Sequence, residues 1–300
     1  MTLQPLIIER GEIRVEQAMT PEEMAPVQDL QREIWGYGEP GADFPYPTRA
    51  LFSLAESGGL VSVARVREEL AGFAVAWLGL DATSRGCYLH SQLLGVRPRF
   101  RRRGVAFSLK IHQAHYARSR GLRFIRWTFD PLRAQNARFN LHRLGAVAGE
   151  YREDYYGNLQ SRFQAGDPSD RLLVVWDVES SRVEARLAGD HAEPPGDFPL
   201  LNPSGSFEPD ADRVEELLGS SAGVRLAIPA QIDALRLRDP AGAGRWRLTC
   251  RRLFQAALQA GFVATDFTDS VPDAAPEEAG RLRAYVLEKV PAAAVFGRGR

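Results

Sequence analysis

The stretch "VRPRFRRRGVAFSLK" at residues 96–110 constrains this chain more than any other. Five of its first eight residues are arginines, and Gly104 separates them from a run typical of a helix. Free backbone N–H groups and the positive end of the dipole favour an anion at a helix start, and glycine allows close approach. The residues alone leave three interpretations: a nucleic-acid-binding arm, a solvated charged turn, or a cradle for a phosphorylated cofactor.

The charge around this stretch is one-sided, although the chain as a whole is balanced. Lys and Arg together number 38, as do Asp and Glu, so the formal net charge is +0. Between Asp81 and Asp130 there is no carboxylate, but there are eleven lysines and arginines. Solubilising surfaces normally mix signs, so we expect a polyanion to bind nearby. The neutral net charge, and Phe100 as the only aromatic residue among the arginines, argue against nucleic acid.

The composition is that of an ordinary globular protein, with 44% hydrophobic and 25% charged residues. Cys87 and Cys250 lie far apart, so we expect neither a disulfide framework nor a metal site. Charges at positions 9, 10 and 12 argue against a signal peptide, and no apolar run approaches the roughly 18–20 residues of a membrane span. We therefore expect a cytoplasmic protein that binds neither membranes nor nucleic acid.

Hydrophobic periodicity predicts an α+β fold, in which helices pack against a mixed sheet. Thr20, Pro21 and Glu23 form a capping-box pattern that predicts a helix running to Trp35. Further helices are predicted at 47–57, 105–120 and 134–144, and strands at 12–19, 60–67, 70–80, 87–96, 123–129, 146–154 and 171–178.

Changes in composition and hydrophobic periodicity along the sequence indicate three regions. Residues 1–180 form the first domain, and residues 181–222, rich in Pro, Gly and acid, are expected to be a linker or extended loop. Residues 223–300 then predict a smaller α/β unit with a helix at 244–260. Its order of elements loosely echoes the end of the first domain, as expected either of an internal duplication, which would make it half of the first fold, or of convergent packing.

In this setting, "LGVRPRFRRRGVA" at residues 94–106 resembles the acyl-CoA-binding signature of the GNAT superfamily of N-acyltransferases. The core of that signature is Arg/Gln-x-x-Gly-x-Gly/Ala after a strand and before a helix. The resemblance covers about residues 10–180. It implies a splayed mixed sheet flanked by helices, an acyl-CoA co-substrate, and direct acyl transfer to the amine of a small molecule; it leaves a homodimer open.

Four further segments resemble a narrower subfamily of bacterial acyltransferases, some of them associated with N-succinylamino acid racemases. These segments are "SQLLGV", "WTFDPLRAQNARFNLHRLGA", "YYGNL" and "DPSDRLLVVW". The likeness implies an acetyl or succinyl group as the acyl moiety, and an amino acid as the acceptor.

The superfamily resemblance also implies roles for individual residues. The strand would bind the pantetheine arm and the loop the phosphates, through Leu94, Gly95, Val96, Arg101, Arg102, Arg103, Gly104, Val105 and Ala106. A backbone N–H near Leu93 or Leu94 would stabilise the oxyanion, and Asn136 would contact the arm.

The catalytic acid is the weakest part of the resemblance, because Leu141 stands where many members have tyrosine. His90 is a candidate base, although a packed strand histidine is the alternative. Tyr155 is a candidate acid, as are its neighbours Tyr151 and Tyr156, although ordinary aromatic packing would also explain them. Water could equally take the proton, and a CoA-binding regulatory or scaffold protein without catalysis is the alternative function.

Two charged residues are candidates for substrate binding. Asp130 either holds the acceptor ammonium or caps the turn that follows it. Arg171 would bind the free carboxylate of a succinyl group, or simply form a surface pair with Asp170.

Overall fold

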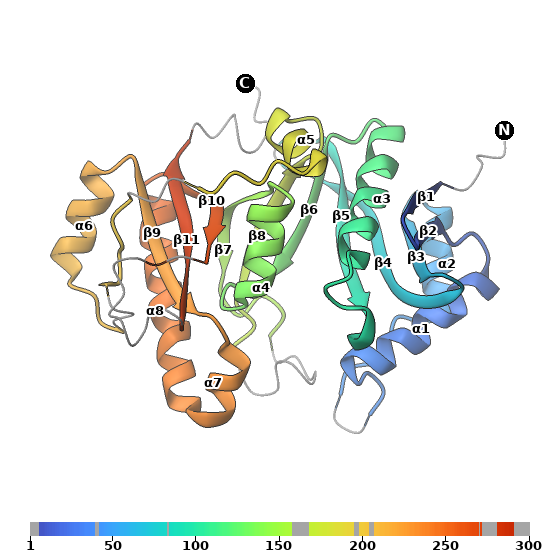
Figure 1. The fold of residues 1–300 in the computed structure, drawn as a ribbon, viewed down its shortest axis with the longest axis horizontal. Coiled ribbons are helices and arrows are strands. Elements are labelled where there is room, and N and C mark those ends of the chain that lie inside the picture. Colours follow the sequence, from blue (N-terminus) through green and yellow to red (C-terminus); the bar gives the residue numbers. More distant parts are fainter. Residues whose placement is uncertain are drawn as a thin grey trace. The chain divides into compact units, whose positions relative to one another are not determined.

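The computed structural model describes residues 6–39, 42–82, 84–157, 168–194, 198–203, 207–269, 271 and 281–290. Its contacts divide the chain into two compact units, shown as ribbons in Figure 1. The first comprises residues 1–127 and 159–166, and the second 128–158 and 167–300. Residues 128–158 therefore share a compact unit with 223–300, whereas the sequence led us to place them in separate domains.

The first unit is built on a mixed sheet, which confirms the predicted α+β class. Its strands follow the order β1-β2-β3-β4-β5, each antiparallel to its neighbour, and β6 then pairs with β5 in parallel. The strands are β1 (Ile7–Arg10), β2 (Ile13–Gln17), β3 (Leu60–Val66), β4 (Glu69–Leu80), β5 (Cys87–Val96) and β6 (Phe124–Phe129). Helix α3 (Val105–Ser119) makes the crossover from β5 to β6 that a parallel pair requires.

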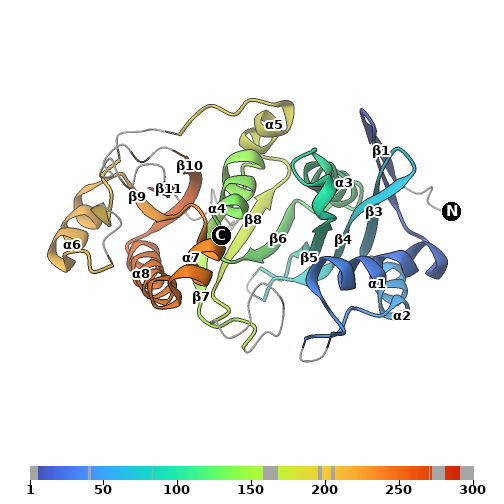
Figure 2. The same ribbon diagram turned by 60° about the horizontal axis from the view of Figure 1, so that its bottom comes forward.

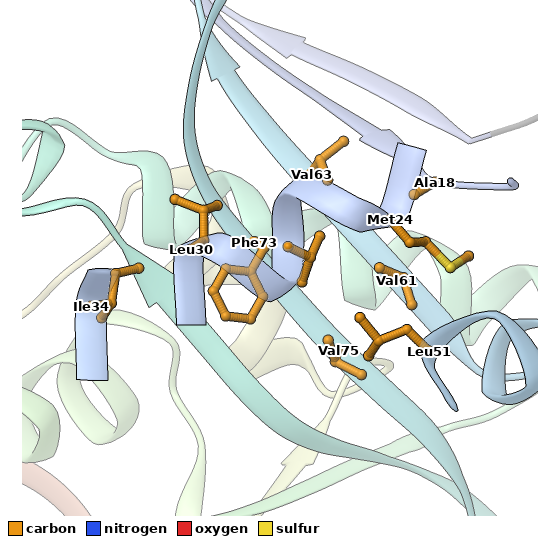
Figure 3. Close-up of a cluster of buried hydrophobic side chains, with 10 residues drawn as sticks. Ala18, Met24, Leu30, Ile34, Leu51, Val61, Val63, Phe73 and Val75 are labelled. Atoms are coloured by element: carbon orange, nitrogen blue, oxygen red, sulfur yellow. The ribbon is translucent and has the colours of Figure 1, made fainter. Parts of the chain in front are cut away.

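Helices α1 (Pro21–Trp35) and α2 (Thr48–Glu56) cover one face of this sheet (Figure 2). Large side chains from β3 and β4 meet those of the helices there, as the close-up in Figure 3 shows. This cluster contains Ala18, Met24, Val27, Leu30, Ile34, Leu51, Val61, Val63, Phe73 and Val75. The alternation of strand residues places the intervening side chains on the other face.

The opposite face carries α3 and is lined by small residues. Ala64 and Ala74 are fully buried against Val105 and Leu109 of the helix. Because alanine adds so little volume, α3 can pack close to the strands. This closeness brings the start of α3 next to the end of β5.

Helix α1 begins as the sequence predicts. The Thr20 hydroxyl accepts a hydrogen bond from the Glu23 amide at 3.3 Å, and the Glu23 carboxylate accepts one from the Thr20 amide at 3.2 Å. Two N–H groups that the helix cannot satisfy itself are thus bonded.

The second unit has an antiparallel sheet in the order β8-β7-β10-β11-β9. Its strands are β7 (Val147–Arg152), β8 (Arg171–Asp177), β9 (Gly223–Pro229), β10 (Phe262–Thr268) and β11 (Leu282–Lys289). Residues 223–290 thus contain the strands that the predicted α/β unit requires, and β10 joins them to β7 through the pair Ala148 and Ala264. Helices α7 (Ile232–Arg238) and α8 (Pro240–Gln259) lie between β9 and β10 in the chain.

Three segments of this unit differ from the sequence-based expectation. The helix predicted at 134–144 is α4 (Ala134–Ala137), which widens into the π-helical turn η2 (Arg138–Arg143). Within residues 181–222, where we expected a linker, lie α5 (Ser181–Ala188) and α6 (Ala211–Ser220). Ser180 and Asp210 cap these two helices with their side chains, a local signal that the Pro and Gly content obscured.

Candidate functional site

The fifth strand carries one extra residue relative to its neighbour. In the register of β4 and β5, Ala76 pairs with Ser91 but Val75 pairs with Leu93, so Gln92 forms a β-bulge. Before the bulge, β5 also pairs with β6, at Leu89 and His90. Beyond it, in the part of the first unit that the structure describes, β5 pairs only with β4. The other edge of this half-strand thus presents backbone groups that an extended ligand can bind.

The end of β5 leads directly into a tight turn before α3. The short 3-10 helix η1 (Pro98–Phe100) buries Phe100, and the chain then reverses through residues 101–104. Gly104 takes φ 87° as the N-cap of α3 and offers no side chain to the first-turn N–H groups. A Cβ here would meet only the Ile13 side chain, at 3.6 Å, so the backbone angle rather than packing requires glycine. No side chain caps this helix start, and such a start suits an anion.

The arginines around this turn fall into two groups. Arg97 donates to Glu33 at 2.9 Å and to the Leu70 carbonyl at 2.7 Å, and Arg99 forms an ion pair with Glu69. The second group, Arg101, Arg102 and Arg103, is exposed, and none of the three has a carboxylate partner among the described residues. The first group fastens the turn, while the second leaves its positive charge uncompensated at the start of α3.

The other residues of the signature differ in burial, and therefore in which of their atoms could contact a ligand. Gly95 is buried where a Cβ would lie 2.7 Å from the Phe73 ring, so β5 can pass over that ring only with glycine. Val96 and Val105 are also buried, and so only their backbones could reach a ligand. Leu94 and Ala106 are half-buried.

His90 lies directly before the bulged region and is half-buried. Its ring stacks on Trp77 with centroids 5.4 Å apart, and its Nε2 is 2.9 Å from Oε1 of Gln92. Burial lowers the pKa of His90 below its ordinary value, against a raising contribution from the hydrogen bond with Gln92. The imidazole is therefore neutral at pH 7 and able to accept a proton.

Asp130 belongs to the second unit, where its carboxylate is already engaged. Arg247 donates to both oxygens, at 2.6 and 3.0 Å, and the Leu132 amide donates at 3.0 Å. Burial alone would raise the pKa of Asp130, but Arg247 and these hydrogen bonds outweigh it and hold the pKa below its ordinary value. The contact with Leu132 is the turn cap that the sequence offered as the alternative role.

The candidate tyrosines also lie in the second unit. Tyr155 is 42% exposed and packs edge-on against Tyr156, whose hydroxyl is 3.2 Å from that of Thr128. Tyr151 donates to Asp170 at 2.6 Å, and its burial raises its pKa above the ordinary value. Leu141 is fully buried in η2.

Arg171 does not pair with the side chain of Asp170. It donates to the Asp170 backbone carbonyl at 3.0 Å, and its guanidinium lies over the Tyr156 ring at 5.2 Å. The Asp170 carboxylate is bound instead by Arg251, at 2.8 and 3.0 Å. Asn136 is exposed on α4.

The predicted residues are thus divided between the units. The signature residues and His90 belong to the first, and Asp130, Asn136, Tyr155 and Arg171 to the second. No group of three or more metal-ligating side chains occurs in the described part of the chain, and none of its helices is long and apolar enough to cross a membrane. Sequence reasoning missed Arg247 as the partner of Asp130 and Lys110 as a buried amine; the second had a signal, since Lys110 interrupts the apolar run of α3.

Part of the chain is similar to known proteins. The model of the acetyltransferase (GNAT) family matches residues 24–146, and curated protein sequences gave no match. Similar solved structures include the ribosomal-protein-S18-alanine N-acetyltransferase of Escherichia coli (15% identity, 56% of this chain and 96% of that chain, TM-score 0.43). A second is the putative acetyltransferase yncA of Salmonella typhimurium with acetyl-CoA (14% identity, 57% of this chain and 97% of that chain, TM-score 0.44). A third is Arabidopsis thaliana NAA60 with acetyl-CoA (18% identity, 55% of this chain and 99% of that chain, TM-score 0.43).

The pair of Asp130 and Arg247 predicts a large effect on stability. Arg247→Met leaves a carboxylate buried without its partner, which we expect to lower the free energy of unfolding by about 3–5 kcal/mol. Urea denaturation measures the loss. The double variant Asp130→Asn, Arg247→Met removes both charges and should lose clearly less than the single variant; equal losses would contradict this account.

Proposed function

Because residues 24–146 match the model of the acetyltransferase (GNAT) family, we propose that the protein is a CoA-dependent N-acyltransferase. It transfers an acetyl or succinyl group from an acyl-CoA to the amine of a small molecule, with amino acids as the first class to test. The observation that carries this proposal is the positively charged turn between β5 and α3, described above. The resemblance of four segments of this chain to the racemase-associated subfamily favours succinyl as the acyl group and an amino acid as the acceptor.

The turn has the groups that a CoA pyrophosphate needs. The first-turn N–H groups of α3 and the glycine at position 104 suit an anion held close to the backbone. Arg101, Arg102 and Arg103 add charge that no carboxylate in the described chain neutralises, and the first turn of α3 contains no acidic residue. Arginine forms strong charge-assisted hydrogen bonds with phosphate oxygens.

The bulged edge of β5 suits the remainder of the donor. The pantetheine arm contains amide groups, and the backbone of Leu94 and Val96 could pair with them as an added strand would. A bound acyl-CoA supplies an activated thioester carbonyl. A backbone N–H of Leu93 or Leu94, next to the bulge at Gln92, is our proposed donor to the oxygen of that carbonyl as it gains charge.

The acceptor amine must lose a proton before it can attack, because an ammonium has no lone pair. His90 is the proposed base, since it is neutral at pH 7 and lies two residues before the bulge. The roles of Asn136, Tyr155 and Arg171 stay predictions. Asp130 holds Arg247, and we assign it no part in acceptor binding.

A second function has one observation in its favour. Leu141, at the position of the usual acid, is fully buried and chemically inert. A protein that binds CoA without transferring an acyl group, as a regulator or scaffold, would have no need of that acid.

Release of free CoA thiol distinguishes the two functions. We expect purified protein to release thiol from acetyl-CoA or succinyl-CoA only when an amine is present, tested with L- and D-amino acids. Release with succinyl-CoA and one amino-acid class would support the narrower resemblance. Tight CoA binding without release from either donor would favour the regulatory function.

The phosphate role predicts a selective loss of donor affinity. Arg101→Ala and Arg103→Ala should each weaken CoA binding about tenfold or more, since each removes a charged hydrogen bond. Isothermal titration with CoA and with pantetheine measures this, and pantetheine, which lacks the phosphates, should bind equally to all variants. Arg120→Ala removes the same charge from the other end of α3 and is the matched control. A similar loss in the control would point to a general effect of charge.

The role of His90 predicts a change in rate and in pH dependence. His90→Ala should lower kcat by about a hundredfold or more and leave CoA affinity unchanged. In the wild type, kcat/KM should fall as the pH drops through a pKa below the ordinary histidine value, because protonation removes the base. That acid limb should disappear in the variant; an unchanged profile would exclude His90 as the base.

A further inference from the structure

Lys110 is a buried amine that the proposed function has not used. It is one of only two lysines in the chain, and it lies on the side of α3 that faces the sheet, 3% exposed. Its Nζ donates to the Ser91 hydroxyl at 3.0 Å, and the Ser91 hydroxyl donates to Oε1 of Gln113 at 2.9 Å. Its Nζ also lies 3.5 Å from the centre of the Trp127 ring.

The surroundings of Lys110 favour the uncharged amine. No carboxylate pairs with it in the described part of the chain, and the sequence contains none from residue 82 to 129. A cation over a tryptophan ring is stabilised by the ring, but burying a charge without a carboxylate partner costs more than this contact returns. Burial therefore lowers the pKa of Lys110 well below its ordinary value.

The same lysine is linked to the bulge of β5. Ser91 lies between His90 and the bulged Gln92, so the hydrogen bond from Lys110 fixes the strand at the point where its pairing changes. A charge on Lys110 would lower the pKa of His90 on β5.

We propose that Lys110 is a positioning residue for acyl transfer, which holds Ser91 and the bulge in place without adding charge beside His90. This inference rests on the proposed function. By holding the bulge, its neutral amine would position the backbone N–H groups of Leu93 and Leu94, the proposed donors to the thioester oxygen. A charged residue at the same position would oppose proton transfer to His90.

The lysine content of the chain permits a direct test of the charge state. Protein labelled with carbon-13 at lysine Cε gives two NMR signals, one for Lys110 and one for Lys289, which is exposed and serves as the internal control. We expect the Lys110 signal to titrate at a clearly lower pH than that of Lys289. Titration of both at the ordinary lysine pKa would overturn the proposal.

Kinetics test the positioning role separately from the charge. Lys110→Met and Ser91→Ala should each lower kcat about tenfold and leave the KM for acyl-CoA unchanged. The double variant should be no slower than either single one, because both remove the same link. Multiplied losses, or no loss at all, would contradict the proposal.

The melting temperature of one variant and the pH profile of another give two independent readouts. Lys110→Met should melt at or above the wild-type temperature, because the buried amine costs stability, whereas a purely structural lysine would destabilise on removal. Lys110→Arg should lose activity and move the acid limb of the pH profile further down, since its charge is permanent.

Failure of the proposal is distinguishable from failure of the proposed function. If the wild type releases no CoA thiol, the acyltransferase proposal fails, while the NMR titration still reports whether Lys110 is neutral. If the wild type is active and Lys110→Met is equally active with unchanged KM, only the role of Lys110 fails.

Discussion

The single extra residue at Gln92 is the constraint on which the candidate site depends. It lets β5 pair on both sides before the bulge and, among the described residues of the first unit, only with β4 after it. This second half then runs into the turn that starts α3, so a strand paired on one side and a helix start without a side-chain cap follow each other within one short segment. The buried link from Lys110 to Ser91 reaches the strand at this same point.

Much of the first unit was predictable because its signals are local. The cap formed by Thr20 and Glu23, the alternation of β3 and β4, and the glycine before α3 each lie within a few residues of the structure that they determine. The bulge was not predictable, because it is a property of the register between two strands. Which arginines of the turn are paired and which are not was unpredictable for a related reason. Glu33, for example, lies 64 residues before the Arg97 that donates to it.

The second unit shows the same limit more strongly. Asp130 pairs with Arg247, which lies 117 residues further along the chain, and Asp170 pairs with Arg251, which lies 81 residues further. These ion pairs join segments that differ in amino-acid composition. Composition alone therefore assigned residues 128–157 and 223–290 to separate domains. The buried partner of a charged residue also decides its chemistry: Asp130 could be assigned as a turn cap or as an ammonium site from sequence, and only the geometry of Arg247 distinguished them.

The scarcity of lysine has a consequence for the proposed use of an acyl-CoA thioester. Acyl-CoA molecules acylate amines slowly without any enzyme, and only an unprotonated lysine is a target, because arginine stays charged and does not react. Of the 38 basic residues, 36 are arginine; Lys110 is shielded by burial, and the Nζ of Lys289 donates to the Leu218 carbonyl at 2.9 Å. A surface whose positive charge comes from arginine can attract the phosphates of an acyl-CoA and yet resist acylation by its thioester.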